Sequence, residues 1–167
     1  MGTVNYDIIR KIKEVLKIPV IVNGGIGTNF AEAERAIEMT GCDGVMSSEG
    51  ILEYPALYDP SGTFDMDELT NEYLDLYEQY PYEAQLKSVK SHLFRFLYQG
   101  LQKHTDLRDQ LGRAKGIEAI REVATLMKER RKDDPPQDKL GWYYRHWNKM
   151  GLDKETTKTF SIVDWNE

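Results

Sequence analysis

Two short strand patterns occur in the sequence, and both fall within the first fifty residues. A β-branched run covers residues 18–22, and a second run covers 43–47. Helical periodicity covers residues 6–16 and about 29–39, so helices and strands alternate with short connections. Such alternation predicts parallel strands joined by crossover helices. Because two parallel strands alone cannot cover their faces and edges, we expect residues 1–58 to end a larger α/β domain whose beginning is absent.

The remainder of the chain carries only helical patterns. Apolar spacing predicts helices over residues 65–80, 82 to about 103 and 116–131, with a short connecting turn or helix over 104–111. The predicted fold class is therefore α/β followed by all-α, with a helical bundle domain at 65–132. Asp133-Asp134-Pro135-Pro136 ends the regular pattern, and residues 133–167 form an aromatic C-terminal extension.

A glycine-containing turn follows each predicted strand. Asn23-Gly24-Gly25 follows the first strand, and Ser47-Ser48-Glu49-Gly50 follows the second about 24 residues later. Both turns are thus expected at the carboxyl ends of adjacent parallel strands, where (β/α)8 barrels place active sites and, after their last two strands, often a phosphate. Glycines let backbone N–H groups approach an anion, although they also serve simply as tight turns. The pairing of two such turns favours an anion site.

Charge is distributed unevenly along the chain, which has a net charge of −6. Residues 1–81 contain 5 lysines and arginines against 15 acidic residues, whereas residues 82–132 contain 12 against 6. The basic segment includes Lys87, Lys90 and Arg95 on one predicted helix, with His92 between them. Phosphate contacts need cations on a common surface, so this helix is a candidate RNA-binding element. The alternative is an ordinary solvated charged helix.

Cysteine and histidine are scarce, which limits metal and redox chemistry. Cys42 is the single cysteine and the chain has three histidines, so we expect neither a disulfide framework nor a metal site. Cys42 precedes the second strand and is assigned to packing. No apolar run is long enough for a bilayer and no secretory signal is present, so we expect an intracellular protein, cytoplasmic or nuclear, with no membrane partner.

Three segments taken together resemble the C-terminal part of the tRNA-dihydrouridine synthases, in the eukaryotic branch that acts on the D-loop. They are Ile18 to Ile26, Thr40 to Gly50 and Pro55 to Tyr58. The helix around Lys90 to Arg95 also resembles the helical domain of that family. The resemblance extends over roughly residues 5–115, and the combination of segments is more specific than the first one alone.

The resemblance implies the last two strand–helix units of an FMN-dependent TIM (β/α)8 barrel, followed by a tRNA-binding helical domain. It places Asn23, Gly24, Gly25, Ser48 and Glu49 near the FMN phosphate, with NADPH as hydride donor and a tRNA uridine as substrate. Many bacterial members have Gly-Arg at the last two positions, so this chain lacks that cation. The family's cysteine acid lies on a loop nearer the N-terminus, and we expect no catalytic residue within this chain.

By the same resemblance, the RNA-binding residues are Lys87, Lys90, His92 and Arg95. Two other functions stay open: a non-catalytic RNA-binding or interaction module, and the end of a different phosphate-binding barrel enzyme. The aromatic residues of the extension are expected to dock onto the helical domain rather than to stack on bases; they are Trp142, Tyr143, Tyr144 and Trp147.

Overall fold

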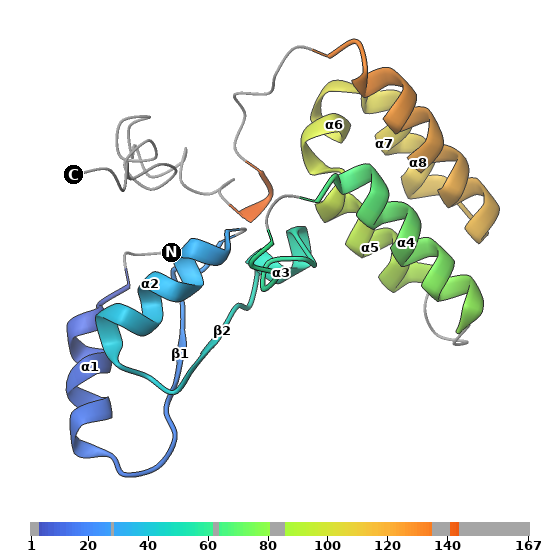
Figure 1. The fold of residues 1–167 in the computed structure, drawn as a ribbon. Helices are drawn as coiled ribbons and strands as arrows, with labels where there is room; N and C mark the ends of the chain where they lie inside the picture. The colour runs from blue at the N-terminus through green and yellow to red at the C-terminus, as the bar shows by residue number, and fades with distance from the viewer. Residues whose placement is uncertain (1–3, 28, 62–63, 81–85, 135–140, 144–167) are drawn as a thin grey trace.

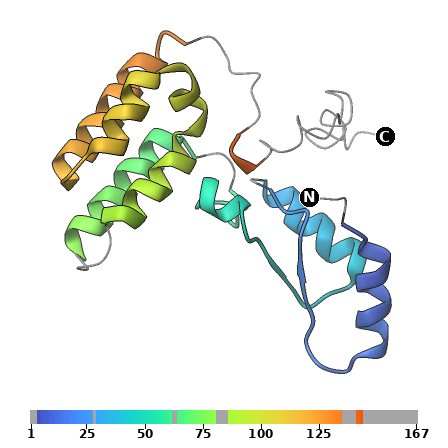
Figure 2. The same cartoon turned by 180° about the vertical axis from the view of Figure 1, so that it is seen from behind.

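The computed structural model describes residues 4–27, 29–61, 64–80, 86–134 and 141–143. These residues form two units, a small α/β unit and a helical unit (Figures 1 and 2). Among the described residues, the fold is mostly helical with a single two-stranded parallel sheet. No helix among them has both the length and the apolar character needed to cross a membrane.

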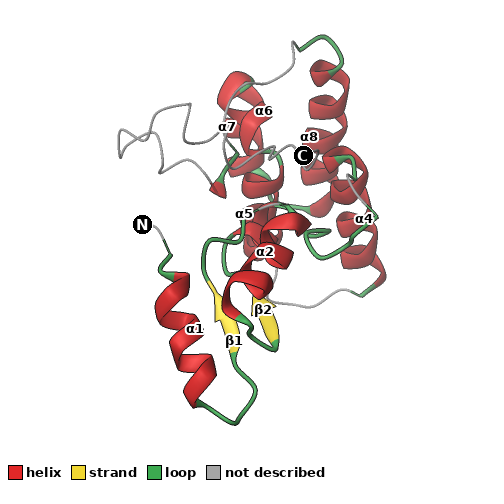
Figure 3. Cartoon of the chain, turned by 60° about the vertical axis from the view of Figure 1, so that its left-hand side comes forward, coloured by secondary structure: helices red, strands yellow, loops and turns green. Residues whose placement is uncertain are grey.

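The α/β unit contains the predicted helix–strand–helix–strand order. Helix α1 (Tyr6–Val15) leads to strand β1 (Ile21–Asn23), and helix α2 (Phe30–Thr40) leads to strand β2 (Gly44–Met46). The strands are parallel, with Val22 opposite Val45, and they lie side by side (Figure 3). Gly41 ends α2 at a φ of +67°, a conformation that glycine adopts without steric cost.

Only one face of the strand pair is covered. Val22 is buried in a core with Ala33, Ala36 and Cys42, all supplied by β1, α2 and the turn that follows α2. Ile21, which points to the opposite side of β1, is 55% exposed. Helices α1 and α2 pack on the same side of the strand pair, so no described element covers the face that carries Ile21 (Figure 1). The burial of Cys42 confirms that it is a packing residue.

The exposed face of the α/β unit is markedly apolar, as expected for strands that end a larger domain. Large exposed hydrophobic side chains lie on α1, on both strands and on the connection between α1 and β1. They are Ile8, Ile12, Val15, Leu16, Ile18, Ile21 and Met46. Patches of this kind on a soluble domain indicate a surface that another element covers.

The helical unit packs five helices around one core: α4 (Met66–Gln79), α5 (Leu86–Phe96), α6 (Tyr98–Lys103), α7 (Thr105–Arg113) and α8 (Ile117–Arg131). Helix α4 begins at Asp65, whose carboxylate accepts hydrogen bonds from the N–H groups of Asp67 and Glu68. These acids lie at the helix N-terminus, where negative charge is favourable.

The predicted helix from residue 82 to about 103 is divided in two. Helix α5 ends at Phe96, and α6 begins at Tyr98 after a break at Leu97. The change of direction brings Gly100 of α6 against Met127 of α8, where a Cβ on the glycine would lie 2.4 Å from the methionine sulfur. The periodicity of the segment does not reveal this break, because buried apolar residues continue through it from Leu93 to Leu101.

Helix α3 (Gly50–Glu53) directly follows the turn after β2 and connects the two units. It packs against α5 and lies between the α/β unit and the helical unit in both views (Figures 1 and 2). Only this short helix therefore separates the glycine turns of the α/β unit from the helical unit.

Candidate functional site

The two glycine turns begin side by side at the carboxyl ends of the strands. Asn23 and Met46 are register partners in the parallel pair, so both turns leave the same edge of the sheet. Two serines join them. The Ser48 hydroxyl donates to Asn23 Oδ1 over 3.1 Å, and the Ser47 hydroxyl donates to the Ile26 carbonyl over 3.2 Å. The structure thus brings Asn23 and Ser48 together, as the sequence predicts.

Gly50 lies directly against the Gly27 carbonyl where the two turns meet, although nothing in the sequence marks it as a site residue. A Cβ on this residue would lie 1.6 Å from the Gly27 carbonyl oxygen, so only glycine fits where the two backbones meet. Ser47 supports the same contact, because its hydroxyl also accepts the N–H of Ile51 in α3. The signal available in the sequence was a glycine at the first position of a helix, where a side chain is normally tolerated.

Gly24 and Gly25 adopt backbone conformations that other residues avoid. Their φ angles are +120° and +71°. The Tyr6 hydroxyl donates to the Gly24 carbonyl over 3.2 Å, and a Cβ on Gly25 would lie 2.6 Å from the Tyr6 oxygen. Burial raises the pKa of Tyr6, with the charge of Glu32 adding to the shift and Arg35 opposing it. Tyr6 therefore serves this turn as a neutral hydrogen-bond donor. Its position at the start of α1 gives no sign of this role in the sequence.

The surroundings of the turns are acidic. The Gly27 N–H donates to Glu32 Oε2 over 2.6 Å, so an internal carboxylate already uses this backbone donor. Glu49 is half-buried, and neither turn contains a lysine or arginine. Burial, followed by the charges of Glu32, Tyr6 and Glu49, raises the pKa of Tyr143 to about 12. An anion at these turns would therefore be bound by neutral donors.

The hydrogen-bond donors of the two turns fit a phosphate group, provided that neutral donors alone bind it. Backbone N–H groups at a glycine turn bind phosphates without a side-chain cation, and hydroxyl and amide groups add further hydrogen bonds. Asn23 and Ser48 are exposed at the ends of the strands and can provide such groups. Glu49 is the predicted residue that fits least, because its carboxylate would repel a phosphate unless its side chain points away.

On α5, the four predicted RNA-binding residues do not share one surface. Lys87 is exposed, but Lys90 Nζ donates to the carbonyls of Gly112 and Ala114, both over 3.1 Å. This lysine therefore binds the carboxyl end of α7, where cations are favourable. It also lies next to the exposed Arg113 and Lys115 through those backbone contacts.

His92 and Arg95 are held within the protein. His92 Nδ1 lies 2.7 Å from the Tyr73 hydroxyl, and the His92 ring stacks on Phe96. Burial, and secondarily the Arg95 charge, lowers the pKa of His92, which favours the neutral ring. Arg95 Nη1 donates to the Ser91 carbonyl and hydroxyl over 2.7 and 2.6 Å. An RNA-contacting role for these two residues stays a prediction, and both have intramolecular partners.

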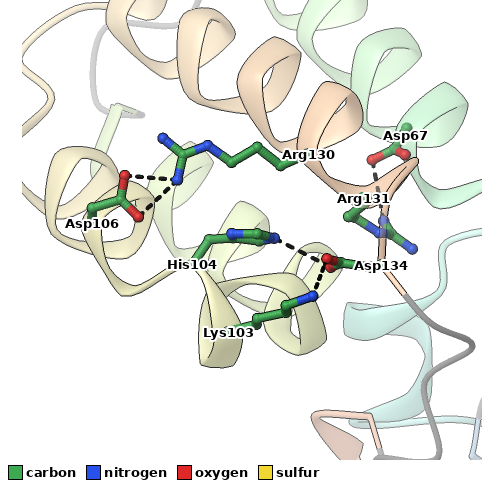
Figure 4. Close-up of polar contacts among 7 residues, drawn as sticks. All are labelled: Asp67, Lys103, His104, Asp106, Arg130, Arg131 and Asp134. Atoms are coloured by element: carbon green, nitrogen blue, oxygen red, sulfur yellow. Dashed lines mark hydrogen bonds and ion pairs between the residues drawn. The ribbon is translucent and has the colours of Figure 1, made fainter.

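Among the described residues, ion pairs engage four of the twelve lysines and arginines of residues 82–132, and Figure 4 shows those of Lys103, Arg130 and Arg131. Arg130 binds Asp106 over 2.8 Å and Arg131 binds Asp67 over 3.2 Å. Asp134 accepts from both Lys103 and His104, and Arg121 pairs with two acids of α4. The acids come largely from outside residues 82–132, so the folded helical unit is less basic than its sequence segment.

Three exposed cations of the helical unit, Lys87, Arg113 and Lys115, take no part in these ion pairs and lie near one another around Lys90. Lys87 precedes Lys90 by one helical turn, and Lys90 contacts the backbone that carries Arg113 and Lys115. Within the described part of the chain, none of Lys87, Arg113 and Lys115 has an acidic partner within 4.0 Å. We call Lys87, Lys90, Arg113 and Lys115 the basic surface; it is the candidate RNA-binding region of the helical unit.

The part of the aromatic extension that the structure describes, residues 141–143, packs against the rest of the protein. Tyr143 is only 9% exposed, and the Trp142 ring lies under the Arg95 guanidinium at 4.8 Å. The prediction of docking onto the helical domain is confirmed for Trp142, which meets Arg95 of α5, whereas Tyr143 binds Glu53 of α3 instead. Tyr144 and Trp147 lie outside the described residues. Among the described residues, no group of three or more histidines, cysteines and acids is arranged to hold a metal ion.

Comparison with known proteins gives a consistent result. The sequence profile of the family described as Dihydrouridine synthase (Dus) matches residues 1–139. A rat protein named tRNA-dihydrouridine(16/17) synthase [NAD(P)(+)]-like is 36% identical over 140 residues, which are 84% of this chain and 31% of that protein. A Schizosaccharomyces pombe tRNA-dihydrouridine(16/17) synthase [NAD(P)(+)] is 27% identical over 77% of this chain and 36% of its own length.

A third relative matches a shorter region. A probable tRNA-dihydrouridine synthase from Rickettsia prowazekii is 50% identical over 56 residues, which are 34% of this chain and 17% of that protein. The similarity to the rat and yeast proteins is thus long enough to require residues of the helical unit, whereas the bacterial match is about as long as the α/β unit. The chain spans about a third of the length of the rat relative. Its matches to the family profile and to these relatives establish that the chain belongs to the dihydrouridine synthase (Dus) family.

Proposed function

We propose that this chain is the C-terminal part of an FMN-dependent tRNA-dihydrouridine synthase that reduces uridine in tRNA to 5,6-dihydrouridine with NADPH. In this proposal, the α/β unit supplies the last two strand–helix units of a TIM (β/α)8 barrel. The helical unit supplies tRNA contacts. The observation that carries the proposal is the pair of hydrogen-bonded glycine turns at the carboxyl ends of β1 and β2, in a chain that belongs to the Dus family.

The residues proposed to hold the FMN phosphate are Asn23, Gly24, Gly25, Ser48 and Glu49. Asn23 and Ser48 supply side-chain polar groups, and the glycines allow the backbone to approach. Glu49 would contribute only through its backbone, since its carboxylate is an unfavourable neighbour for phosphate. When bound, FMN would carry a hydride from NADPH to the uridine, and the proton donor is expected from a part of the enzyme outside this chain.

The exposed apolar face of the α/β unit supports the same proposal. Ile18, Ile21 and Met46 have no covering element within the described residues, although strands of a closed barrel are covered on both sides. The earlier strands of the barrel are the proposed cover. The chain alone would then retain tRNA contacts but not catalysis, and this outcome would also match the alternative of a non-catalytic RNA-binding module.

The test uses the intact protein that contains this chain. After purification, flavin absorbance reports bound FMN, and incubation with NADPH and unmodified tRNA should convert uridine to a nucleoside heavier by two hydrogen atoms. Mass spectrometry of the digested tRNA detects that product. Failure to bind flavin or to form dihydrouridine would overturn the proposal. Retained tRNA binding without either property would favour the non-catalytic alternative.

A further inference from the structure

A three-residue segment of the C-terminal extension connects the two units of the structure. Residues 141–143, Gly-Trp-Tyr, lie beside α2 and α3 at the junction of the units in both overall views (Figures 1 and 2). We call them the GWY segment. Its Tyr143 N–H donates to Glu53 Oε2 at the end of α3 over 2.6 Å, a contact between residues 90 positions apart. The extension thus returns to the helix that follows the Ser47–Gly50 turn.

The segment packs closely against Glu53 at a glycine. A Cβ on Gly141 would lie 1.8 Å from Glu53 Oε1 and 2.7 Å from the carboxyl carbon. Gly141 is itself buried. One carboxylate therefore binds the segment at both ends, through close packing with Gly141 and through the hydrogen bond from Tyr143. Such a contact restricts where residues 141–143 can lie on α3.

Trp142 attaches the same segment to the helical unit. The Arg95 guanidinium lies 4.8 Å from the centre of the Trp142 ring, within the range of a cation–π interaction. Two hydrogen bonds to Ser91 hold the guanidinium on α5, so the indole meets a group of fixed orientation. A planar guanidinium suits this stacking, whereas a lysine ammonium at the same place does not reproduce it.

Tyr143 lies near the glycine turns. Its side chain is buried, and the charges that act on it come from Glu32, Tyr6 and Glu49. Tyr6 binds the Gly24 carbonyl, and Glu32 binds the Gly27 N–H. The GWY segment therefore contacts Glu53 of α3 and Arg95 of α5, and its buried Tyr143 lies within electrostatic range of residues beside the glycine turns. In this way it joins both units.

We propose that the GWY segment is a clasp that fixes the orientation of the helical unit relative to the two glycine turns, with Trp142 and Arg95 as positioning residues for tRNA. This inference rests on the proposed function, in which the basic surface holds tRNA phosphates while a uridine reaches the cofactor beside the turns. Catalysis then depends on the distance between the two sites being set before tRNA binds, because a small misplacement of reactants is costly. The clasp supplies that constraint.

The kinetic test is a double-mutant cycle in the intact protein with Trp142→Ala, Arg95→Ala and both changes together. We expect each single change to lower kcat/KM for tRNA by about tenfold. The double variant should be no worse than either single one, because both remove one interaction. The rate at which NADPH reduces the flavin should not change. Fully additive effects, or equal loss in flavin reduction, would overturn the proposal.

Arg95→Lys separates positioning from direct RNA contact. The lysine keeps the charge and would preserve a phosphate contact, but it loses the planar stacking on Trp142. We expect Arg95→Lys to resemble Arg95→Ala, and Trp142→Phe to retain most of the activity. Tyr80→Ala, which removes a 68% exposed aromatic side chain at the end of α4, is the matched control for Trp142→Ala. Wild-type activity in Arg95→Lys would show a phosphate contact and overturn the clasp.

A measurement without catalysis keeps this inference distinct from the proposed function. The connection between the units contains Tyr58 and Phe64, which are 40% and 39% exposed and are chymotrypsin sites. Without the clasp the units should move apart more often, so Trp142→Ala should be cut there several times faster than wild type or Tyr80→Ala. An unchanged cleavage rate overturns the clasp. Absence of dihydrouridine formation by the wild type overturns only the proposed function.

Discussion

The Ser48 hydroxyl donates a hydrogen bond to Asn23 Oδ1 over 3.1 Å and joins two turns whose residues are 25 positions apart. Both side chains are exposed at the carboxyl edge of the parallel pair. The bond uses the amide oxygen of Asn23 and leaves its amide nitrogen, a donor of two hydrogens, for other partners. A phosphate at this edge would therefore meet a neutral donor on a side chain that Ser48 holds in place.

Asn23→Asp should lower the affinity of the intact protein for FMN by about tenfold or more, because it replaces a donor with a carboxylate beside the phosphate. Asn29→Asp is the matched control. Asn29 caps α2 by accepting the Ala31 N–H, and aspartate performs that role equally well. Flavin content after gel filtration measures both variants. Equal retention in the two variants would contradict the assignment of Asn23 to the cofactor site.

Gly50→Ala should destabilise the protein by about 3 kcal/mol or more, since the added methyl group would overlap the Gly27 carbonyl and force the turns apart. Gly112→Ala is the control, because that glycine lies inside α7 and the nearest side-chain atom to its Cβ is 4.0 Å away. There alanine should stabilise by about 1 kcal/mol through helix propensity. Urea denaturation midpoints give both values. A Gly50→Ala protein as stable as the wild type would show that the two turns do not pack as described.

Local patterns in the sequence predict most of the elements. The apolar spacing of residues 65–80 and 116–131 identifies α4 and α8 to within a residue or two, since each has one buried stripe. The alternation of the first fifty residues predicts the parallel pair and the adjacency of the two turns, and the structure confirms both. The sequence does not predict the break at Leu97, because the apolar pattern continues through it; in the structure α6 places Gly100 close to Met127.

Side-chain partners that are distant in the sequence could not be predicted. Lys90, His92 and Arg95 form a plausible cationic helix when α5 is considered alone. In the structure they bind the end of α7, Tyr73 and Trp142 respectively, and each partner is far away along the chain. The location of a basic surface depends on which cations find acids in the fold, and Asp67 and Asp134 supply such acids from outside the basic segment.

Arg131→Ala should destabilise the protein by about 3 kcal/mol, and Arg130→Ala by less than about 1 kcal/mol. The two arginines are neighbours at the end of α8, and each pairs with one aspartate (Figure 4). Asp67 is 11% exposed whereas Asp106 is 63% exposed, so loss of Arg131 leaves a buried carboxylate without its partner. Burial already raises the pKa of Asp67 in spite of Arg131. Equal effects in thermal denaturation would contradict this difference in burial.

The stability of the protein should fall as the pH decreases from about 7.5 to 5.5, and His92 should contribute to that fall. Burial, then the Arg95 charge, lowers the pKa of folded His92 below the unfolded value of about 6.5. The unfolded chain therefore binds the proton first, and stability is lost as the pH falls through this window. His92→Gln should reduce the slope of unfolding free energy against pH. Tyr73→Phe should keep it, because burial rather than the tyrosine hydrogen bond is the main cause.

Arg113→Glu with Lys115→Glu should weaken tRNA binding far more than Lys11→Glu with Lys17→Glu. Both pairs are exposed and both double variants change the net charge equally, so the comparison isolates location from bulk charge. The first pair belongs to the basic surface, whereas the second lies on and after α1. Lys90 is left unchanged because it binds the end of α7, and its reversal would also disturb folding.

Binding measured against salt concentration should show a log–log slope that is shallower by roughly one unit for each lost phosphate contact in the Arg113 and Lys115 variant. Equal weakening in the two variants, with equal slopes, would mean that tRNA responds only to net charge and that the basic surface makes no specific phosphate contacts.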